Sequence, residues 1–251
     1  MVKNGFGRLS LKKEIIGPCK PCKGTGFDED GHPCGCMLKF RAFNRMITNG
    51  FSRKSLDLVS SPSYDFPVID QGEEFVNLFY KSPEIVEDKG LSLFIHSKEK
   101  GRGKTTLAHS LVYNAAYYYS ETSVYKSART YQFLHIEDLI ALAKKDKFDF
   151  CKSTWLVIDD LGNEDKAASW KQAIVISALQ RLLHYRRDHS LSTILTSNYA
   201  PSSLSLLYKG DLDSLMEIGY DGHIKGILFR EIEVGGGEDF RIAEDLTQWP
   251  I

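Results

Sequence analysis

Short, nearly continuous apolar runs alternate with longer mixed segments through most of the chain. The runs predict four buried strands, at residues 91–96, 130–135, 154–160 and 192–198. The segments that follow three of these runs predict helices at residues 103–119, 136–145 and 169–187. Strands that alternate with helices are typical of a parallel sheet covered by helices on both faces. The expected fold class is therefore α/β.

The ends of the chain follow other patterns. Met37, Phe40, Phe43 and Ile47 recur every three or four residues and predict a basic, amphipathic helix. Further elements are expected, a short helix at about 72–80, a helical start at 202–208 and a strand or mixed element at 226–234. A segment rich in Ser, Pro and Asp is typical of a linker. We therefore expect a head at 1–56, a linker at 57–74 and a body at 75–251.

Charge is unevenly placed along the chain, which has a formal net charge of −1. The head carries +7, which leaves −8 for the remainder. This balance fits a head that meets an anionic or acidic partner, and it equally fits a solvated basic face. No apolar run approaches the length of a membrane helix, and the amino terminus lacks the apolar core of a signal peptide. We expect a cytoplasmic protein without membrane contact.

Four of the five cysteines lie close together, as Cys19, Cys22, Cys34 and Cys36. Clustered thiols in a cytoplasmic chain favour a metal site over disulfides. The C-x2-C and C-x-C pairs fit the four tetrahedral ligands of a structural zinc ion. Two alternatives stay open: His32 replaces one cysteine, or the thiols are free. Zinc binding would supply most of the folding energy of so short a segment.

The stretch FIHSKEKGRGKTT, residues 94–106, looks like a phosphate-binding loop, G-x-x-x-x-G-K-[ST], between a predicted strand and a predicted helix. Lys98 occupies the position of the first glycine. In such a loop, backbone amides and the helix amino terminus direct positive charge toward phosphates. The lysine reaches the β- and γ-phosphates, and the hydroxyl ligates Mg²⁺. The residues expected to hold ATP here are Gly101, Arg102, Gly103, Lys104, Thr105 and Thr106.

Polar side chains end two of the other predicted strands. Asp159 and Asp160 end an apolar strand, which is typical of a Walker B motif. In that motif one acid holds Mg²⁺ and the next orients the attacking water. Asn198 ends the strand after it and would hold the same water against the γ-phosphate. The three motifs in this order predict ATP binding.

These motifs resemble those of AAA+ P-loop ATPases that load helicases, of the DnaC and DnaI type, and the related IstB-type transposition helper ATPases. The resemblance covers residues 75–242 and is carried by GRGKTTLAHSL, LVIDDLGNE, YRRDHSLSTILTSNY and ILFREIEV. The cysteine head followed by NRMITNGFSRKSLDL is similar to the zinc-bearing amino-terminal part of some bacterial and phage loaders.

The resemblance implies a loader whose head binds a replicative hexameric helicase and which places that helicase on single-stranded DNA during replication initiation. It further implies slow ATP turnover and subunits that assemble side by side and grip the DNA. By motif it assigns Lys104 and Thr105 to Walker A, Asp159 and Asp160 to Walker B, Asn198 to sensor 1, and Arg230 to a late arginine motif that contacts nucleotide.

The surface that would contact DNA is less defined. Lys144, Lys145 and Lys147 are interleaved with aromatic residues, a composition that suits single strands and equally suits a solvated loop. Two other functions stay open. One is an IstB-type helper that remodels duplex DNA and recruits a transposase, which the head and its partner would distinguish. The other is a zinc adaptor that binds nucleotide without turnover, which an ATPase assay with single-stranded DNA would distinguish.

Overall fold

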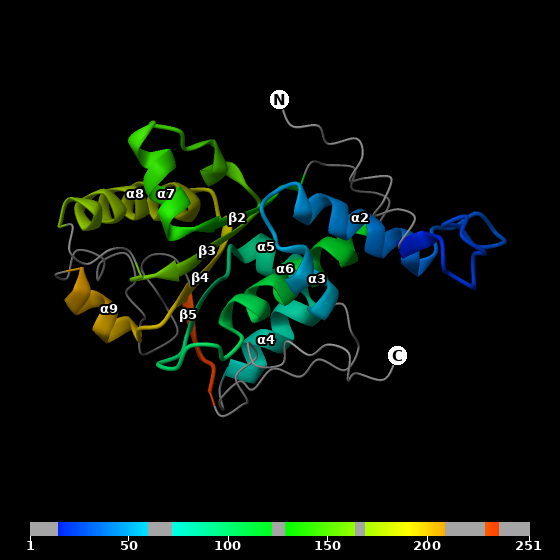
Figure 1. Cartoon of the computed structure of the whole chain (residues 1–251), viewed down its shortest axis with the longest axis horizontal. Coiled ribbons are helices and arrows are strands. Elements are labelled where there is room, and N and C mark those ends of the chain that lie inside the picture. The colour runs from blue at the N-terminus through cyan, green and yellow to red at the C-terminus, as the bar shows by residue number, and fades with distance from the viewer. Residues whose placement is uncertain (1–14, 60–71, 122–128, 164–168, 209–228, 236–251) are drawn as a thin grey trace.

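One five-stranded sheet organises the chain. The computed structural model describes residues 15–59, 72–121, 129–163, 169–208 and 229–235. The strands are β1 (Ser92–His96), β2 (Tyr131–His135), β3 (Trp155–Leu161), β4 (Ser192–Ser197) and β5 (Phe229–Glu233). They lie in the order β2-β3-β4-β1-β5, and all neighbours are parallel (Figure 1). The four strands predicted from apolar runs are confirmed, and the segment at 226–234 supplies the fifth.

Helices cover both faces of the sheet, as the alternating pattern predicts (Figure 1). One face carries α6 (Lys104–Glu121), and the other carries α7 (Ile136–Lys144) and α8 (Ser169–Asp188). Successive strand residues serve opposite faces: Leu93 and Ile95 join the core cluster of α6, whereas Phe94 joins that of α7 and α8. Two short elements complete this part, η1 (Asp149–Lys152) and α9 (Pro201–Leu207). Of the helices in the described segments, none has the length and apolar character needed to cross a membrane.

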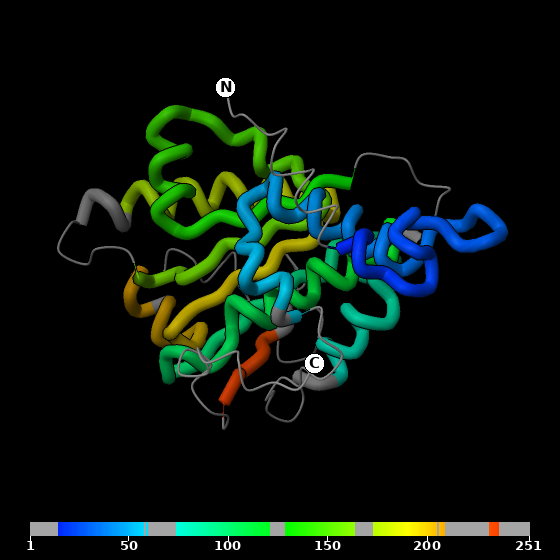
Figure 2. Tube along the Cα trace, turned by 45° about the vertical axis from the view of Figure 1, so that its right-hand side comes forward, coloured from blue at the N-terminus to red at the C-terminus, as the bar shows by residue number. Residues whose placement is uncertain are grey.

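Helices α2 (Gly35–Ile47), α3 (Arg53–Val59), α4 (Gly72–Lys81) and α5 (Pro83–Lys89) precede β1. Helices α2, α3 and α4 lie beside α6, on the same face of the sheet (Figure 2). The buried side chains of Phe43, Met46 and Leu56 share one hydrophobic cluster with α6 and the strands. A division of the chain at residues 56 and 74 stays a prediction, and it would cut through this cluster.

The turn after α2 lies against β2, an edge strand of the sheet. The backbone amide of Phe133 donates a hydrogen bond to the carbonyl oxygen of Asn49 over 3.0 Å. Gly50 follows with φ of 92°, and a Cβ atom there would lie 2.8 Å from the carbonyl oxygen of Phe133. Only glycine allows both the backbone conformation and this approach. The turn is therefore held tightly on the edge of the sheet.

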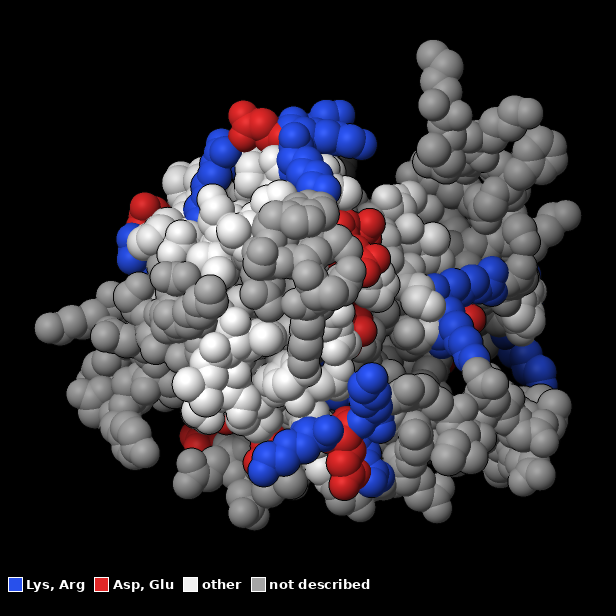
Figure 3. All heavy atoms as spheres, turned by 60° about the vertical axis from the view of Figure 1, so that its left-hand side comes forward, with Lys and Arg blue, Asp and Glu red and all other residues white. Residues whose placement is uncertain are grey.

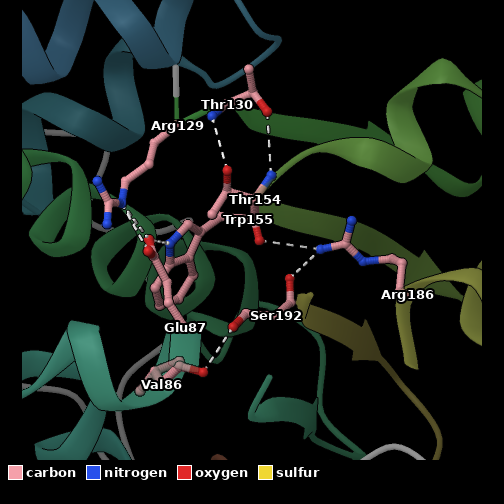
Figure 4. Close-up of polar contacts among 8 residues, drawn as sticks. All are labelled: Val86, Glu87, Arg129, Thr130, Thr154, Trp155, Arg186 and Ser192. Atoms are coloured by element: carbon pink, nitrogen blue, oxygen red, sulfur yellow. Dashed lines mark hydrogen bonds and ion pairs between the residues drawn. The ribbon is translucent and has the colours of Figure 1, made fainter. Parts of the chain in front are cut away.

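A buried arginine joins the amino-terminal ends of β3 and β4 to α8 (Figure 4). Arg186 is fully buried, and its guanidinium donates to the carbonyl oxygens of Cys151 (2.9 Å), Ser153 (2.7 Å) and Ser192. Burial lowers the pKa of Arg186 to about 9, so the group still carries its charge at neutral pH. Backbone carbonyls from separate elements are satisfied by one side chain, which stabilises this end of the sheet.

Glu87 of α5 forms a second polar connection at the same end of the sheet (Figure 4). Its carboxylate accepts a hydrogen bond from Nε1 of Trp155 over 2.7 Å and pairs with Nε of Arg129 at 2.8 Å. The Arg129 guanidinium also lies 3.7 Å from the centroid of the Tyr119 ring. These contacts tie α5 and the end of α6 to the start of β3.

Candidate functional site

The segment between β1 and α6 has the geometry of a phosphate-binding loop. Gly101 and Gly103 have φ of 81° and 83°, a left-handed conformation that favours glycine. Lys98, at the first glycine position of the pattern, is not among the described residues with positive φ. A side chain is tolerated there without backbone strain, which explains how the loop keeps its form. Helix α6 begins at Lys104, so the amides of its first turn lie at the loop.

Lys104 is enclosed by this loop, with 6% of its surface exposed. Its Nζ atom donates to the carbonyl oxygen of Glu99 at 3.3 Å, and Arg102 pairs with the side chain of the same residue. Phosphate oxygens are stronger acceptors than a neutral carbonyl. An ammonium held in this way is therefore placed to exchange its partner for a phosphate.

Three side chains meet at the carboxyl end of the sheet. Thr105 and Thr196 donate hydrogen bonds to the same Oδ1 atom of Asp159, at 2.8 and 2.6 Å. Asp159 is only 2% exposed, and burial raises the pKa of its carboxyl while the hydrogen bond from Thr196 opposes the rise. Hydroxyl and carboxylate oxygens are ligands that suit Mg²⁺. Thr105 and Asp159 thus fit the ion expected there.

Asp160 lies in a β-bulge beside this group. The pairing between β3 and β4 shifts its register between Ile158 and Leu161. Asp160 has φ of 63°, which is uncommon outside glycine, and its amide donates to Oγ1 of Thr196 over 3.0 Å. Bulges beside active sites commonly re-aim a side chain. The two neighbouring acids consequently differ in environment, because Asp159 is buried and Asp160 is half-buried.

The other residues expected at the site lie in or next to three different elements, β4, α6 and β5. Asn198 follows β4, and its Nδ2 atom donates to Oδ1 of Asn163, in the turn after β3, over 3.2 Å. Thr106 is half-buried in the first turn of α6. The backbone of Arg230 pairs with that of Leu93 across β5 and β1, but its side chain lies outside the part that the structure describes. Its predicted role stays a prediction.

His135 is a neighbour of Asp159 that the motifs do not reveal. It ends β2 opposite Asp159 in the strand register, and its Nδ1 atom lies 3.5 Å from Oδ2 of Asp159. Its side chain is 58% exposed. Thr196 was missed for the same reason: both contacts depend on the register between neighbouring strands. In the sequence, the only mark of these two residues is a polar side chain that ends or interrupts an apolar strand.

The four clustered cysteines converge in space. Sγ of Cys19 lies 3.7 Å from that of Cys34, Sγ of Cys22 lies 3.5 Å from that of Cys36, and all four lie within 4.8 Å of one another. Tetrahedral Zn–S bonds of about 2.3 Å require sulfur atoms about 3.8 Å apart, whereas a disulfide requires about 2 Å. His32 is not part of the group, and its side chain is 78% exposed. The geometry fits one zinc ion held by four thiolates.

A tight local fold brings the two cysteine pairs together. The amide of Gly26 donates to Sγ of Cys22 at 3.2 Å, and Phe27 pairs with Pro33 in a single antiparallel bridge. The chain then enters α2 at Gly35. The loop extends away from the sheet (Figure 1), and its exposed tip is acidic, with Asp28, Glu29 and Asp30. The positive charge of the head is therefore not uniform.

Figure 3 shows Lys and Arg gathered in separate groups on one face, with acidic side chains among them. Lys144, Lys145 and Lys147 are exposed, as their proposed contact with DNA requires. In the same turn, however, Asp146 pairs with Arg181 over 2.7 Å. Contact with DNA stays a prediction.

Comparison of the sequence with family models and with curated proteins gives no match. Among solved structures, the fold is similar to that of the DnaC helicase loader, with a TM-score of 0.52 and 21% identity over 73% of this chain and 100% of that chain. It is also similar to DnaI, with a TM-score of 0.50 and 18% identity over 76% and 95% of the two chains. The expected α/β fold, a parallel sheet flanked by helices, is confirmed, and these two structures share it.

Proposed function

We propose that the chain is an ATP-dependent loader, which binds a replicative hexameric helicase and places it on single-stranded DNA. One observation carries the proposal: Thr105, Asp159 and Thr196 meet beside a phosphate-binding loop, in a fold shared with the DnaC helicase loader. Because one fold can serve many functions, the conclusion depends on the site and not on the fold alone.

The site has a residue for each task in nucleotide binding and hydrolysis. Lys104 transfers its hydrogen bonds from the loop carbonyl to the β- and γ-phosphates. Thr105 and Asp159 would hold Mg²⁺, which would supply positive charge to the phosphates. Asp160 orients the attacking water, and Asn198 holds that water against the γ-phosphate. The glycine-rich loop and the amino terminus of α6 supply the remaining donors.

Turnover is slow in this proposal until copies of the chain assemble. Arg230 contacts the nucleotide of the same or a neighbouring subunit, where a guanidinium neutralises charge on the γ-phosphate. ATP favours the assembly that grips single-stranded DNA, and hydrolysis releases the loader from the helicase. ATPase activity should therefore rise with protein concentration and with single-stranded DNA.

The head, residues 1–56, carries the contact with the helicase. Its four cysteines fit a closed structural site, with no open coordination position for catalysis. Because the loop that carries the cysteines extends away from the sheet (Figure 1), a partner can bind there without covering the nucleotide site.

The decisive experiment mixes the full chain with a bacterial replicative helicase, with ATP and without it, and follows the complex by size-exclusion chromatography. Loading is then measured as helicase retained on circular single-stranded DNA. We expect a complex, and loading that requires ATP. Recruitment of a transposase to duplex DNA, with no helicase complex, would replace the proposal with the IstB-type function. A helicase complex without ATP turnover, with or without DNA, would replace it with the zinc adaptor.

A further inference from the structure

The turn of Asn49, Gly50 and Phe51, which joins α2 to α3, forms a tightly fitted contact between the amino-terminal helices and the sheet. Its backbone is bonded to the edge of β2, and Gly50 approaches the carbonyl of Phe133 too closely for any side chain. Phe51 is 3% exposed and packs against the rings of Phe133 and His109, with centroids 5.5 and 5.2 Å away. Because the interior is closely packed, a displacement of this turn would also shift the rings of Phe133 and His109.

His109 connects the turn to the helix of the phosphate loop. It lies in α6, one helical turn after Thr105, and its ring packs edge-to-face on Phe133 with centroids 4.7 Å apart. Both ring nitrogens are buried, and neither has a hydrogen-bond partner among the described residues. The ring thus contacts its surroundings through packing alone.

Phe133 extends the contacts toward the site. Its ring meets that of His135 edge-to-face, with centroids 4.9 Å apart, and His135 faces Oδ2 of Asp159 at 3.5 Å. The hydroxyls of Thr105 and Thr196 both bond to the other oxygen, Oδ1. His135 therefore faces Oδ2, the carboxylate oxygen of Asp159 to which neither threonine donates a hydrogen bond. A continuous series of contacts runs from Phe51 to the proposed Mg²⁺ ligand.

We infer that the docked turn of Asn49–Phe51 positions His135, and through it Asp159, so that the amino-terminal helices and the Mg²⁺-nucleotide site are energetically coupled. His135 is then a positioning residue. This inference rests on the proposed function, because it assumes that Asp159 serves a bound nucleotide. Coupling of this kind is reciprocal: nucleotide with Mg²⁺ must also stabilise the docked turn.

The test is a double-mutant cycle on the full chain. The variants Phe51→Leu, His135→Ala and the double variant are compared for their affinity for a fluorescent ATP analogue, with Mg²⁺ and in buffer without added Mg²⁺, because a chelator would also remove the proposed zinc. Each single change should weaken Mg²⁺-dependent binding about 5-fold or more, within the usual range of coupling between sites, and leave binding without Mg²⁺ unchanged. Since both changes interrupt one series of contacts, the double variant should bind no more weakly than the weaker single variant.

Phe79→Leu is the matched control. Phe79 is equally buried in the same cluster but packs against Trp155, away from this series of contacts. The Phe79→Leu variant should lose a similar amount of folding stability, and its nucleotide affinity should depend on Mg²⁺ as that of the wild type does. Hydrogen exchange supplies a second measurement: Mg²⁺ with the analogue should slow exchange at residues 49–51 in the wild type and not in His135→Ala.

The outcomes separate this inference from the proposed function. If the wild type binds no nucleotide, the proposed function fails and the inference fails with it. If it binds nucleotide normally, but the two changes act additively or Phe79→Leu alters Mg²⁺ dependence equally, the inference alone is overturned. Unchanged hydrogen exchange at residues 49–51 would have the same meaning.

Discussion

The hydroxyl of Thr105 and the carboxylate of Asp159 lie 2.8 Å apart, although 54 residues separate them in the chain. One residue belongs to the first turn of α6 and the other to β3, so the bond ties the phosphate loop to the carboxyl end of the sheet. The two proposed Mg²⁺ ligands are therefore held together by the fold itself. Such preorganisation lowers the cost of ordering that binding requires.

Replacement of Lys104 should remove nucleotide binding while leaving the fold intact. Lys104→Ala deletes the ammonium, and hydrogen bonds to charged groups contribute about 1.5–3 kcal/mol each. Affinity for an ATP analogue, measured by fluorescence titration, should fall about 10-fold or more. Lys98→Gly restores the usual loop pattern and should bind as well as the wild type or better. Wild-type affinity in Lys104→Ala would disprove the assignment of the loop.

Asp160→Asn should separate binding from turnover. The amide keeps the size of the side chain at the bulge but cannot orient water as a carboxylate does. Affinity for ATP should persist while the rate of phosphate release falls by about 10²-fold, as for other losses of catalytic positioning. If turnover is unchanged, the catalytic acid lies elsewhere, and Glu164 is the next residue to test.

Zinc content should depend on the clustered cysteines alone. Cys22→Ser removes one of four converging thiols, and metal analysis should show the loss of one equivalent of zinc per chain. Cys151→Ser is the control, because Cys151 is buried in the core cluster of α7 and α8 and should leave zinc content unchanged. A wild-type protein without zinc would contradict the metal site, whatever the variants show.

His109 should make folding stability depend on pH. Burial, reinforced by the charge of His135, lowers the pKa of His109 from 6.5 to about 4. Between these values the unfolded chain binds a proton that the folded chain does not, so stability must fall as pH falls from 6.5 toward 4. The slope contributed by one such group is at most about 1.4 kcal/mol per pH unit.

Urea unfolding of the wild type and of His109→Phe at pH 5 and pH 7 measures this contribution. The phenylalanine keeps the aromatic packing and removes the titrating group. The midpoint of the variant should decline less between the two pH values than that of the wild type. Equal declines would mean that His109 takes up its proton without unfolding.

The sequence predicts most of the fold because short apolar runs that alternate with helical segments are typical of strands buried on both faces of a parallel sheet. It also places Asp159 and Lys104 correctly at the carboxyl edge, since motif spacing follows from that topology. Contacts between strands are different. Thr196 and His135 reach Asp159 only through strand register, which spacing along one chain does not encode.

Burial of polar residues was equally hidden from the sequence. Arginine in a helix is usually exposed to solvent. Arg186 is fully buried instead, and it donates hydrogen bonds to backbone carbonyls that the sheet brings together. The packing of α2 and α3 on α6 was also not foreseen. An amphipathic pattern identifies an apolar face but does not name the surface that covers it.

The hydrogen bond between Asn49 and Phe133 has a consequence for self-recognition. An uncovered edge strand offers its backbone to any passing strand and invites aggregation. Here the turn after α2 occupies part of that edge on β2. A chain shortened to begin near residue 60 would uncover it, together with the apolar side of α6. The turn therefore blocks sheet extension at this stretch of β2, and the proposed assembly of copies would use other surfaces.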